Sequence, residues 1–349
     1  MASEPIQKQD IKDLSKDQLI KWLGSHDIEP YRAVQIFKWI YAGLVDTFDA
    51  MTNLKKDIRT LLAAHFSIGR LKTVTMETSR DGCQKFLFEL SDGHSIESVL
   101  IPERTHDTLC ISSQVGCAQG CCFCLTAKIG FIRNLSAGEI LSQVRDIRRH
   151  VGKDAKLTNI VFMGMGEPLA NYPAVRTALS ILTDKEFGLG LSPRKITVST
   201  AGLISKLAQL GNDTDIQLAV SLNATDDETR SRLMPINRKY PIEKLLAACW
   251  QYPLAPRRKI TFEYILIKGV NDSPEDAHQL ARILKAGKAK VNLIPLNPHS
   301  GCDLERPDDA VVTAFQEILH SHQYTTSIRK SKGTDISAAC GQLHARPLE

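Results

Sequence analysis

The chain has 349 residues, of which 43% are hydrophobic and 24% charged, and its formal net charge is +5. These values are typical of a globular protein with a buried core, and the length allows one large domain and a smaller one. No apolar run approaches the roughly 18 residues of a transmembrane helix, and Met1–Lys8 lacks the apolar segment of a secretory signal. The number of cysteines, nine, is odd, which indicates reduced thiols and not a framework of disulfides. The sequence therefore predicts a cytoplasmic protein that does not bind membranes.

The first 70 residues are predicted to form a small helical domain. Ser15–Gln18 has the pattern of a capping box before Leu19–Leu23, and residues 31–41 and 54–65 carry apolar side chains at helical spacing. Five basic residues here could face the phosphates of a nucleic acid: Arg32, Lys38, Lys55, Lys56 and Arg59. Since a charged helix face is more often only solvated, both interpretations stay open.

A β-hairpin is predicted next, within an extension that covers residues 71–105. Residues 84–90 and 95–101 have strand-like alternation on either side of the turn Ser91-Asp-Gly. Glu97 lies in the second of these strands. On composition alone, a carboxylate in such a strand is expected to face solvent.

From residue 106 to the end, strands alternate with helices. Seven strand-like runs are found, at residues 109–114, 159–163, 195–200, 215–222, 259–267, 290–295 and 324–329. Helices are predicted to begin at two capping boxes, Ser136–Glu139 and Thr225–Glu228, and at Ser273–Pro274. The alternation predicts an α/β fold with parallel strands, either a partial barrel or an open sheet, with its site at the carboxyl ends of the strands.

Three cysteines in a short loop form a candidate metal site. Cys117, Cys121 and Cys124 offer three soft thiolate ligands, whereas the side chain of the adjacent Cys122 should diverge from theirs. A structural zinc ion takes four ligands, and a four-iron cluster bound by three cysteines keeps one iron open for a substrate or cofactor. The spacing favours a 4Fe-4S cluster. The alternative is a zinc-binding RNA module without catalysis, with His106 as the fourth ligand.

The cysteine motif and three segments around it resemble one family. Cys-x3-Cys-x2-Cys is similar to the motif of the radical S-adenosylmethionine (SAM) superfamily. Together with residues 110–117, Gly164–Leu169 and Asp335–Leu343, it resembles the RlmN/Cfr family of RNA adenosine methyltransferases, over about residues 29–343. The resemblance implies a partial (β/α)6 radical SAM barrel over residues 106–349, one 4Fe-4S cluster, SAM as cofactor, and an N-terminal helical domain that recognises RNA.

The resemblance also assigns residues that contact SAM. They lie after successive strands of the core: Gly166, Glu167, Ser199, Ser221, Leu222, Asn223 and Asn297. Many relatives have His in place of Asn223. Without the resemblance, serine and asparagine at these positions would be interpreted as strand-end or helix-capping residues.

Three further residues receive catalytic roles from the resemblance. One SAM methylates Cys340, and a second SAM yields a radical that takes a hydrogen atom from this methyl group. The resulting carbon radical of the methyl group adds to adenine, which joins protein and RNA through a thioether. Glu97 then removes the ring proton, and Cys110 forms a disulfide with Cys340 that releases the RNA. Without the resemblance, Cys110 and Cys340 would be expected to be buried and inert.

The family further implies a substrate and partners. The predicted reaction is methylation of adenosine carbon 2 in 23S rRNA and in tRNA beside the anticodon, with a flavodoxin- or ferredoxin-type reductant and a monomeric enzyme. The alternative within the family is methylation at carbon 8. Pro168 favours carbon 2, because the carbon-8 subgroup tends to have Ala there.

Overall fold

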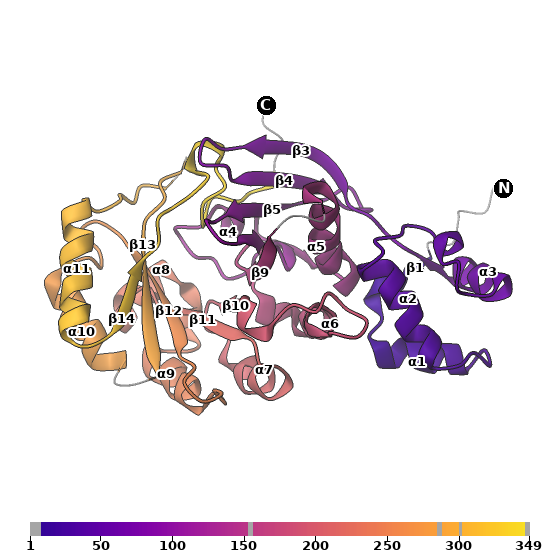
Figure 1. The fold of residues 1–349 in the computed structure, drawn as a ribbon. Helices are drawn as coiled ribbons and strands as arrows, with labels where there is room; N and C mark the ends of the chain where they lie inside the picture. The colour runs from indigo at the N-terminus through magenta and orange to yellow at the C-terminus, as the bar shows by residue number, and fades with distance from the viewer. Residues whose placement is uncertain (1–7, 153–155, 285–287, 300–301, 346–349) are drawn as a thin grey trace.

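A single mixed β-sheet organises most of the chain. The computed structural model describes residues 8–152, 156–284, 288–299 and 302–345. Within these residues ten strands form one sheet, in the order β14-β13-β12-β11-β10-β9-β6-β5-β4-β3. Figure 1 shows this sheet running through the molecule, with β3, β4 and β5 along one edge.

Seven of these strands are parallel and form the core. They are β6 (Asp107–Cys110), β9 (Leu157–Phe162), β10 (Ile196–Thr200), β11 (Gln217–Ser221), β12 (Ile260–Leu266), β13 (Ala289–Pro295) and β14 (Thr325–Ile328). All seven predicted strands are confirmed, although the first ends at Cys110 instead of residue 114. Because β14 does not pair with β6, this α/β core is an open, partial barrel, in agreement with the predicted fold class.

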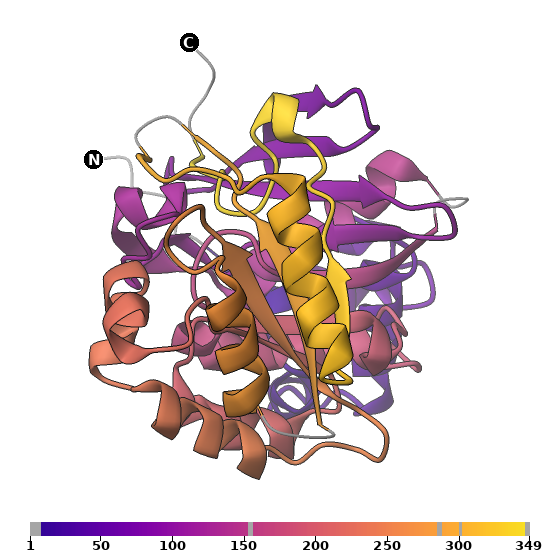
Figure 2. The same ribbon diagram turned by 90° about the vertical axis from the view of Figure 1, so that its left-hand side faces the viewer.

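Helices connect the parallel strands. They are α5 (Ala137–Val151), α6 (Tyr172–Thr183), α7 (Leu207–Asp213), α8 (Asp227–Leu233), α9 (Ile242–Gln251), α10 (Pro274–Leu284) and α11 (Asp309–Ser321). Figure 2 shows α11 packed over β13 and β14, with α10 beside it. The capping box at Ser136 and the start of α10 at Pro274 are confirmed. The box at Thr225 is wrong, since Asp226 caps α8 and the Thr225 hydroxyl donates to Asp276 instead.

The extension continues the same sheet in antiparallel fashion. It contains β3 (Lys72–Thr78), β4 (Gln84–Glu89) and β5 (Ser95–Pro102), and β5 pairs with β6. The hairpin of β4 and β5 is confirmed. The sequence did not predict β3, because six of its seven residues are exposed and lack the alternation of a half-buried strand. A second hairpin, β7 (Gln114–Gly116) with β8 (Phe131–Asn134), encloses the cysteine loop and α4 (Leu125–Ile129).

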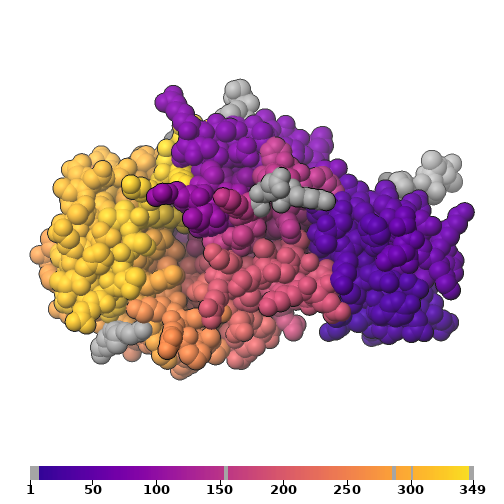
Figure 3. Space-filling view, viewed as in Figure 1, coloured from indigo at the N-terminus to yellow at the C-terminus, as the bar shows by residue number. Residues whose placement is uncertain are grey.

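The N-terminal helices form a unit at one end of the molecule, indigo in Figures 1 and 3. They are α1 (Lys16–Gly24), α2 (Tyr31–Tyr41) and α3 (Lys56–His65), accompanied by the short parallel pair β1 (Gln9–Asp10) and β2 (Phe66–Ser67). The three predicted helices are confirmed, as is the capping box at Ser15. Residues 1–7, whose composition gave no secretory signal, lie outside the described residues.

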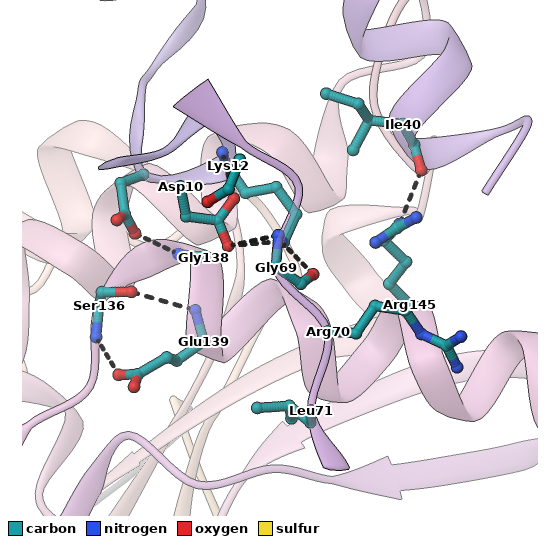
Figure 4. Close-up of polar contacts among 12 residues, drawn as sticks. Asp10, Lys12, Ile40, Gly69, Arg70, Leu71, Ser136, Gly138, Glu139 and Arg145 are labelled. Carbon is teal, nitrogen blue, oxygen red and sulfur yellow. Dashed lines mark hydrogen bonds and ion pairs between the residues drawn. The ribbon is translucent and has the colours of Figure 1, made fainter. Parts of the chain in front are cut away.

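Polar contacts attach this unit to α5, as Figure 4 shows. The fully buried Arg145 donates from Nε to the carbonyl oxygen of Ile40, at 2.9 Å. The backbone N–H of Gly138, in the first turn of α5, donates to the carboxylate of Asp13 at 2.7 Å. An anion is stabilised at a helix N-terminus and a guanidinium satisfies the last carbonyls of a helix, so both contacts fix the orientation of the unit.

No helix in the described ranges combines the length and the apolar character needed to cross a membrane.

Candidate functional site

The three cysteines of the predicted cluster motif lie around one cavity. Cys117 directly follows β7, and Cys124 is the residue before α4. The backbone N–H of Cys117 donates to Gly130 O at 2.9 Å, and that of Cys124 donates to Cys121 O at 3.2 Å, which holds the loop in a tight turn. All three side chains line a cavity of about 160 Å³ at the carboxyl ends of the parallel strands. Cys122 is exposed and does not line it, as expected.

The surroundings of these thiols are apolar. Cys121 and Cys124 pack against a small hydrophobic cluster made of Phe123, Leu233, Met234, Ile267 and Leu296. Burial raises the pKa of the Cys117 thiol to about 12 and also raises the pKa of the other two thiols. Thiolates become favourable in such a place when a positively charged metal group binds them. The three residues therefore suit a metal group of the size of this cavity.

The alternative zinc site does not assemble. His106 immediately precedes β6, so it lies at the amino ends of the parallel strands, opposite the cysteine loop, and it does not line the cavity. Across the described part of the chain, no three His, Cys, Asp or Glu side chains come together closely enough to hold a single metal ion.

The loop Gly164–Glu167 after β9 forms another wall of the cavity. Gly166 has a φ of +100°, and a Cβ there would lie 2.5 Å from the Cβ of Gln114, so glycine is required. The Glu167 carboxylate is 3% exposed and accepts from the backbone N–H of Leu169 at 3.0 Å and of Ala201 at 2.7 Å. Burial raises its pKa. A carboxylate has lone pairs for further donors, so Glu167 can also accept from a ligand in the cavity.

The predicted strand-end residues divide between cavity and core. Ser199, Ser221 and Asn223 line the cavity with Gly166 and Glu167. Asn223 is already used by the protein, because its amide oxygen accepts from Ile265 N at 2.8 Å and its amide nitrogen donates to Met234 Sδ at 3.1 Å. The Leu222 side chain is fully buried in the core and does not line the cavity.

A second cavity, of about 620 Å³, shares several lining residues with the first, among them Cys340. Cys110 and Asn297 line it, and Cys340 lines both cavities. The Cys340 segment is held by its neighbours: Asn297 Nδ2 donates to Cys340 O at 3.1 Å, and Leu125 N donates to Gly341 O at 2.7 Å. Cys110 is buried, which raises the pKa of its thiol to about 12. All nine cysteines are free, so the structure contains no disulfide between Cys110 and Cys340.

Glu97 is buried, contrary to the expectation from composition that it faces solvent. It is 1% exposed and lies 3.3 Å from Lys85 Nζ through Oε1. Its Oε2 accepts from the backbone N–H groups of His344 and Ala345, at 2.8 and 3.0 Å. Glu97 lines neither cavity, because the C-terminal segment, residues 340–345, covers it.

Sequence reasoning missed four charged residues of this region. Arg230 is fully buried and donates to the carbonyl oxygens of Ala201, Ser221 and Leu222, and therefore ties together the ends of β10 and β11. The others are Arg329 and Glu263, which line both cavities, and Lys85, which contacts Glu97. Arg and Lys are almost never fully buried without a partner, but a sequence does not show which of them are buried.

Comparisons with known proteins agree with this geometry. Residues 9–68 match the domain family described as "Ribosomal RNA large subunit methyltransferase N-terminal domain", and residues 111–281 match the radical SAM superfamily. A crystal structure of a radical SAM methyltransferase from Sphaerobacter thermophilus is 44% identical, with a TM-score of 0.90 over 97% of this chain and 100% of that one.

Two curated relatives carry the name dual-specificity RNA methyltransferase RlmN. That of Desulfosudis oleivorans is 57% identical over 97% of this chain and 91% of its own length. That of Geobacter sulfurreducens is 50% identical over 97% of this chain and 92% of its own length. With such identity along nearly its whole length, the chain belongs to the RlmN family of radical SAM enzymes.

Proposed function

We propose that this enzyme methylates carbon 2 of adenosine in 23S rRNA and in tRNA beside the anticodon. The observation that carries the proposal is that Cys340 lines both cavities, the first with Cys117, Cys121 and Cys124 and the second with Cys110. The names of the relatives, which specify RNA methyltransferases of dual specificity, support the choice of substrate.

The first cavity would hold the cofactors. Cys117, Cys121 and Cys124 would bind a 4Fe-4S cluster, whose fourth iron has no cysteine ligand and is open to SAM. Gly166, Glu167, Ser199, Ser221 and Asn223 would bind SAM, with Leu222 packed behind them and Asn297 at the border with the second cavity. When bound, these groups supply the radical chemistry that an unreactive ring carbon requires, with two SAM molecules per turnover.

The protein's own residues would carry the methyl group and release the product. Cys340 would carry the methyl carbon and become joined to RNA through it. The Cys110 thiol would then attack the Cys340 sulfur: a sulfur–sulfur bond forms, the sulfur–carbon bond breaks, and its electron pair and a proton complete the methyl group on RNA. Both thiols border the second cavity, where they would meet. This disulfide is a transient species that a reductant reopens.

Glu97 would act as the general base that removes the carbon-2 proton. Its burial under His344 and Ala345 means that the C-terminal segment has to move before RNA reaches it. The same segment carries Cys340, so one movement would both expose the base and deliver the methyl carrier. We assign residues 71–105 the role of holding this base, residues 106–349 the radical chemistry and residues 1–70 contact with RNA.

We further propose a monomeric, cytoplasmic enzyme that a flavodoxin- or ferredoxin-type protein reduces. Ribosomes and tRNA, which carry its proposed substrates, are found in the cytoplasm. The N-terminal unit presents basic side chains on α2 and α3, among them Lys38, Lys56 and Arg59, which suit contact with phosphates.

The test is mass spectrometry of nucleosides. RNA from cells that lack this protein is incubated anaerobically with reconstituted enzyme, SAM and a reductant, and 2-methyladenosine is expected in 23S rRNA and tRNA. Formation of 8-methyladenosine would show that the enzyme methylates carbon 8 instead of carbon 2. The variant Cys110→Ala should accumulate a covalent protein–RNA adduct, and normal turnover without an adduct would reject the role of Cys110.

A further inference from the structure

Three alternating charges form a row across the antiparallel extension. Lys85 Nζ lies 2.9 Å from Glu77 Oε2 and 3.3 Å from Glu97 Oε1. Glu77 is directly opposite Lys85 in the pairing of β3 with β4, and Glu97 is its diagonal neighbour in the pairing of β4 with β5. The Lys85 side chain is 5% exposed and that of Glu97 1% exposed, so a buried ammonium is shared between two carboxylates.

Strand register places this row on the face of the sheet that carries Cys110. Val99 pairs with Cys110 across β5 and β6, and Glu97 precedes Val99 by two residues, so all three side chains are on one face. Ile101, the next residue on that face, lines the second cavity with Cys110. The Glu97 side chain therefore leaves the sheet on the same face as Cys110.

The two oxygens of Glu97 have different partners. Oε1 faces Lys85, within the sheet, whereas Oε2 accepts from the backbone N–H groups of His344 and Ala345 in the C-terminal segment, which Figure 1 shows beside the extension. Departure of that segment would free Oε2 and leave Oε1 paired. An ionised carboxylate buried in this way is stable only with a paired cation.

We propose that Lys85 is the positioning residue for the general base: its contact with Oε1 keeps the Glu97 carboxylate oriented after the C-terminal segment has left. The inference rests on the proposed role of Glu97 and adds to it a residue that touches neither RNA nor cofactor. The adduct that a carbon radical forms has one unpaired electron, which would pass to an oxidised iron–sulfur group. Proton transfer then breaks the carbon–hydrogen bond of adenine, leaves its electron pair in the ring and forms a carboxyl group at Oε2. Lys85 stays in contact with Glu77 throughout.

The contacts of Glu97 set the expected effect of each variant. Its Oε1 lies beside Lys85 on β4, and Glu77 on β3 contacts the same ammonium. Its Oε2 accepts from the backbone N–H of His344. Loss of Lys85 should therefore leave Oε1 without its charged partner, whereas loss of the Glu77 charge should leave the contact between Lys85 and Glu97 in place.

The experiment measures 2-methyladenosine formation and the protein–RNA adduct in reconstituted variants. Lys85→Met should lower the rate by about tenfold or more and accumulate the adduct, because deprotonation follows adduct formation. Lys85→Arg should restore most of the rate. Glu77→Gln should keep most of the rate. Lys72→Met, on β3 of the same extension but 72% exposed, is the matched control and should behave as the wild type.

Iron content and SAM cleavage without RNA report whether each variant is folded. A wild-type rate for Lys85→Met without accumulated adduct would overturn the inference, as would an equal loss of rate in Glu77→Gln or a failure of Lys85→Arg to restore the rate. A separate variant tests the proposed role of Glu97 as general base. If Glu97→Gln keeps full activity, Glu97 is not the base, whatever the effect of Lys85→Met. If Cys110→Ala forms no adduct, the proposed reaction itself is wrong.

Discussion

Replacement of Arg145 by methionine should loosen the N-terminal unit from the core. Arg145 is fully buried in α5, and it donates to Ile40 O at 2.9 Å, to Asp46 Oδ1 at 2.7 Å and to Val45 O. Ile40 is in the last turn of α2, where carbonyl groups have no partner within the helix. Methionine keeps most of the apolar volume but provides no donor.

The magnitude follows from what loses its partner. Asp46 stays paired with Arg149 at 2.8 Å, so the main loss is the two hydrogen bonds from a charged donor to the carbonyl oxygens. At about 1.5–3 kcal/mol each, the two lost bonds mean that Arg145→Met should destabilise the protein by about 3–6 kcal/mol. Arg149→Met loses one such bond, to Leu44 O, at a residue whose side chain is 28% exposed, and should cost less, about 1.5–3 kcal/mol.

Urea unfolding measures this difference. The fluorescence of Trp22 and Trp39 reports on the N-terminal unit, and Trp250 lies in α9 of the core, so variants that keep only one set of tryptophans separate the two signals. Hydrogen exchange at residues 40–46 should accelerate in Arg145→Met. A loss below about 1 kcal/mol with unchanged exchange would refute the argument that this buried guanidinium attaches the unit.

Three further outcomes concern the site. Cys121→Ser should lose about half or more of the reconstituted iron and sulfide, while Cys122→Ser should retain both, and equal loss from the two would show that the ligands are misassigned. Since burial raises the pKa of Cys110 to about 12, roughly one part in ten thousand of this thiol is thiolate at pH 8. Peptide mapping after iodoacetamide treatment should therefore find the exposed Cys122 modified first, and the rate at Cys110 should rise about tenfold per pH unit. Equal rates of the two cysteines at pH 8 would contradict the burial of Cys110. Gly166→Ala should weaken SAM binding by roughly tenfold or more in equilibrium dialysis, whereas Gly24→Ala, where a Cβ meets nothing, should bind normally.

Local patterns predicted much of the fold. The capping boxes at Ser15 and Ser136 are confirmed because each depends on residues three positions apart. At Thr225 the same pattern is misleading: Asp226 caps the helix, and the threonine hydroxyl contacts Asp276 on a different element. β3 was missed for a related reason, since its pairing with β4, and not its own composition, makes it a strand.

The sequence by itself determined the parts of the site that are contiguous in the chain. Cys117, Cys121 and Cys124 are within one turn-like loop, so their spacing alone brings the three thiols to one cavity. The same holds for Gly166 and Glu167, because a strand followed by a glycine loop places both at the carboxyl end of the sheet.

Only the tertiary structure decided how distant residues combine. It brought Cys110 and Cys340 to one cavity and buried Glu97 against Lys85, under the C-terminal segment. These relations depend on strand order and register, in which a shift of one residue would turn Glu97 to the opposite face of the sheet. Burial then changes the chemistry, because a charged carboxylate that water stabilises at the surface needs a paired cation inside the protein.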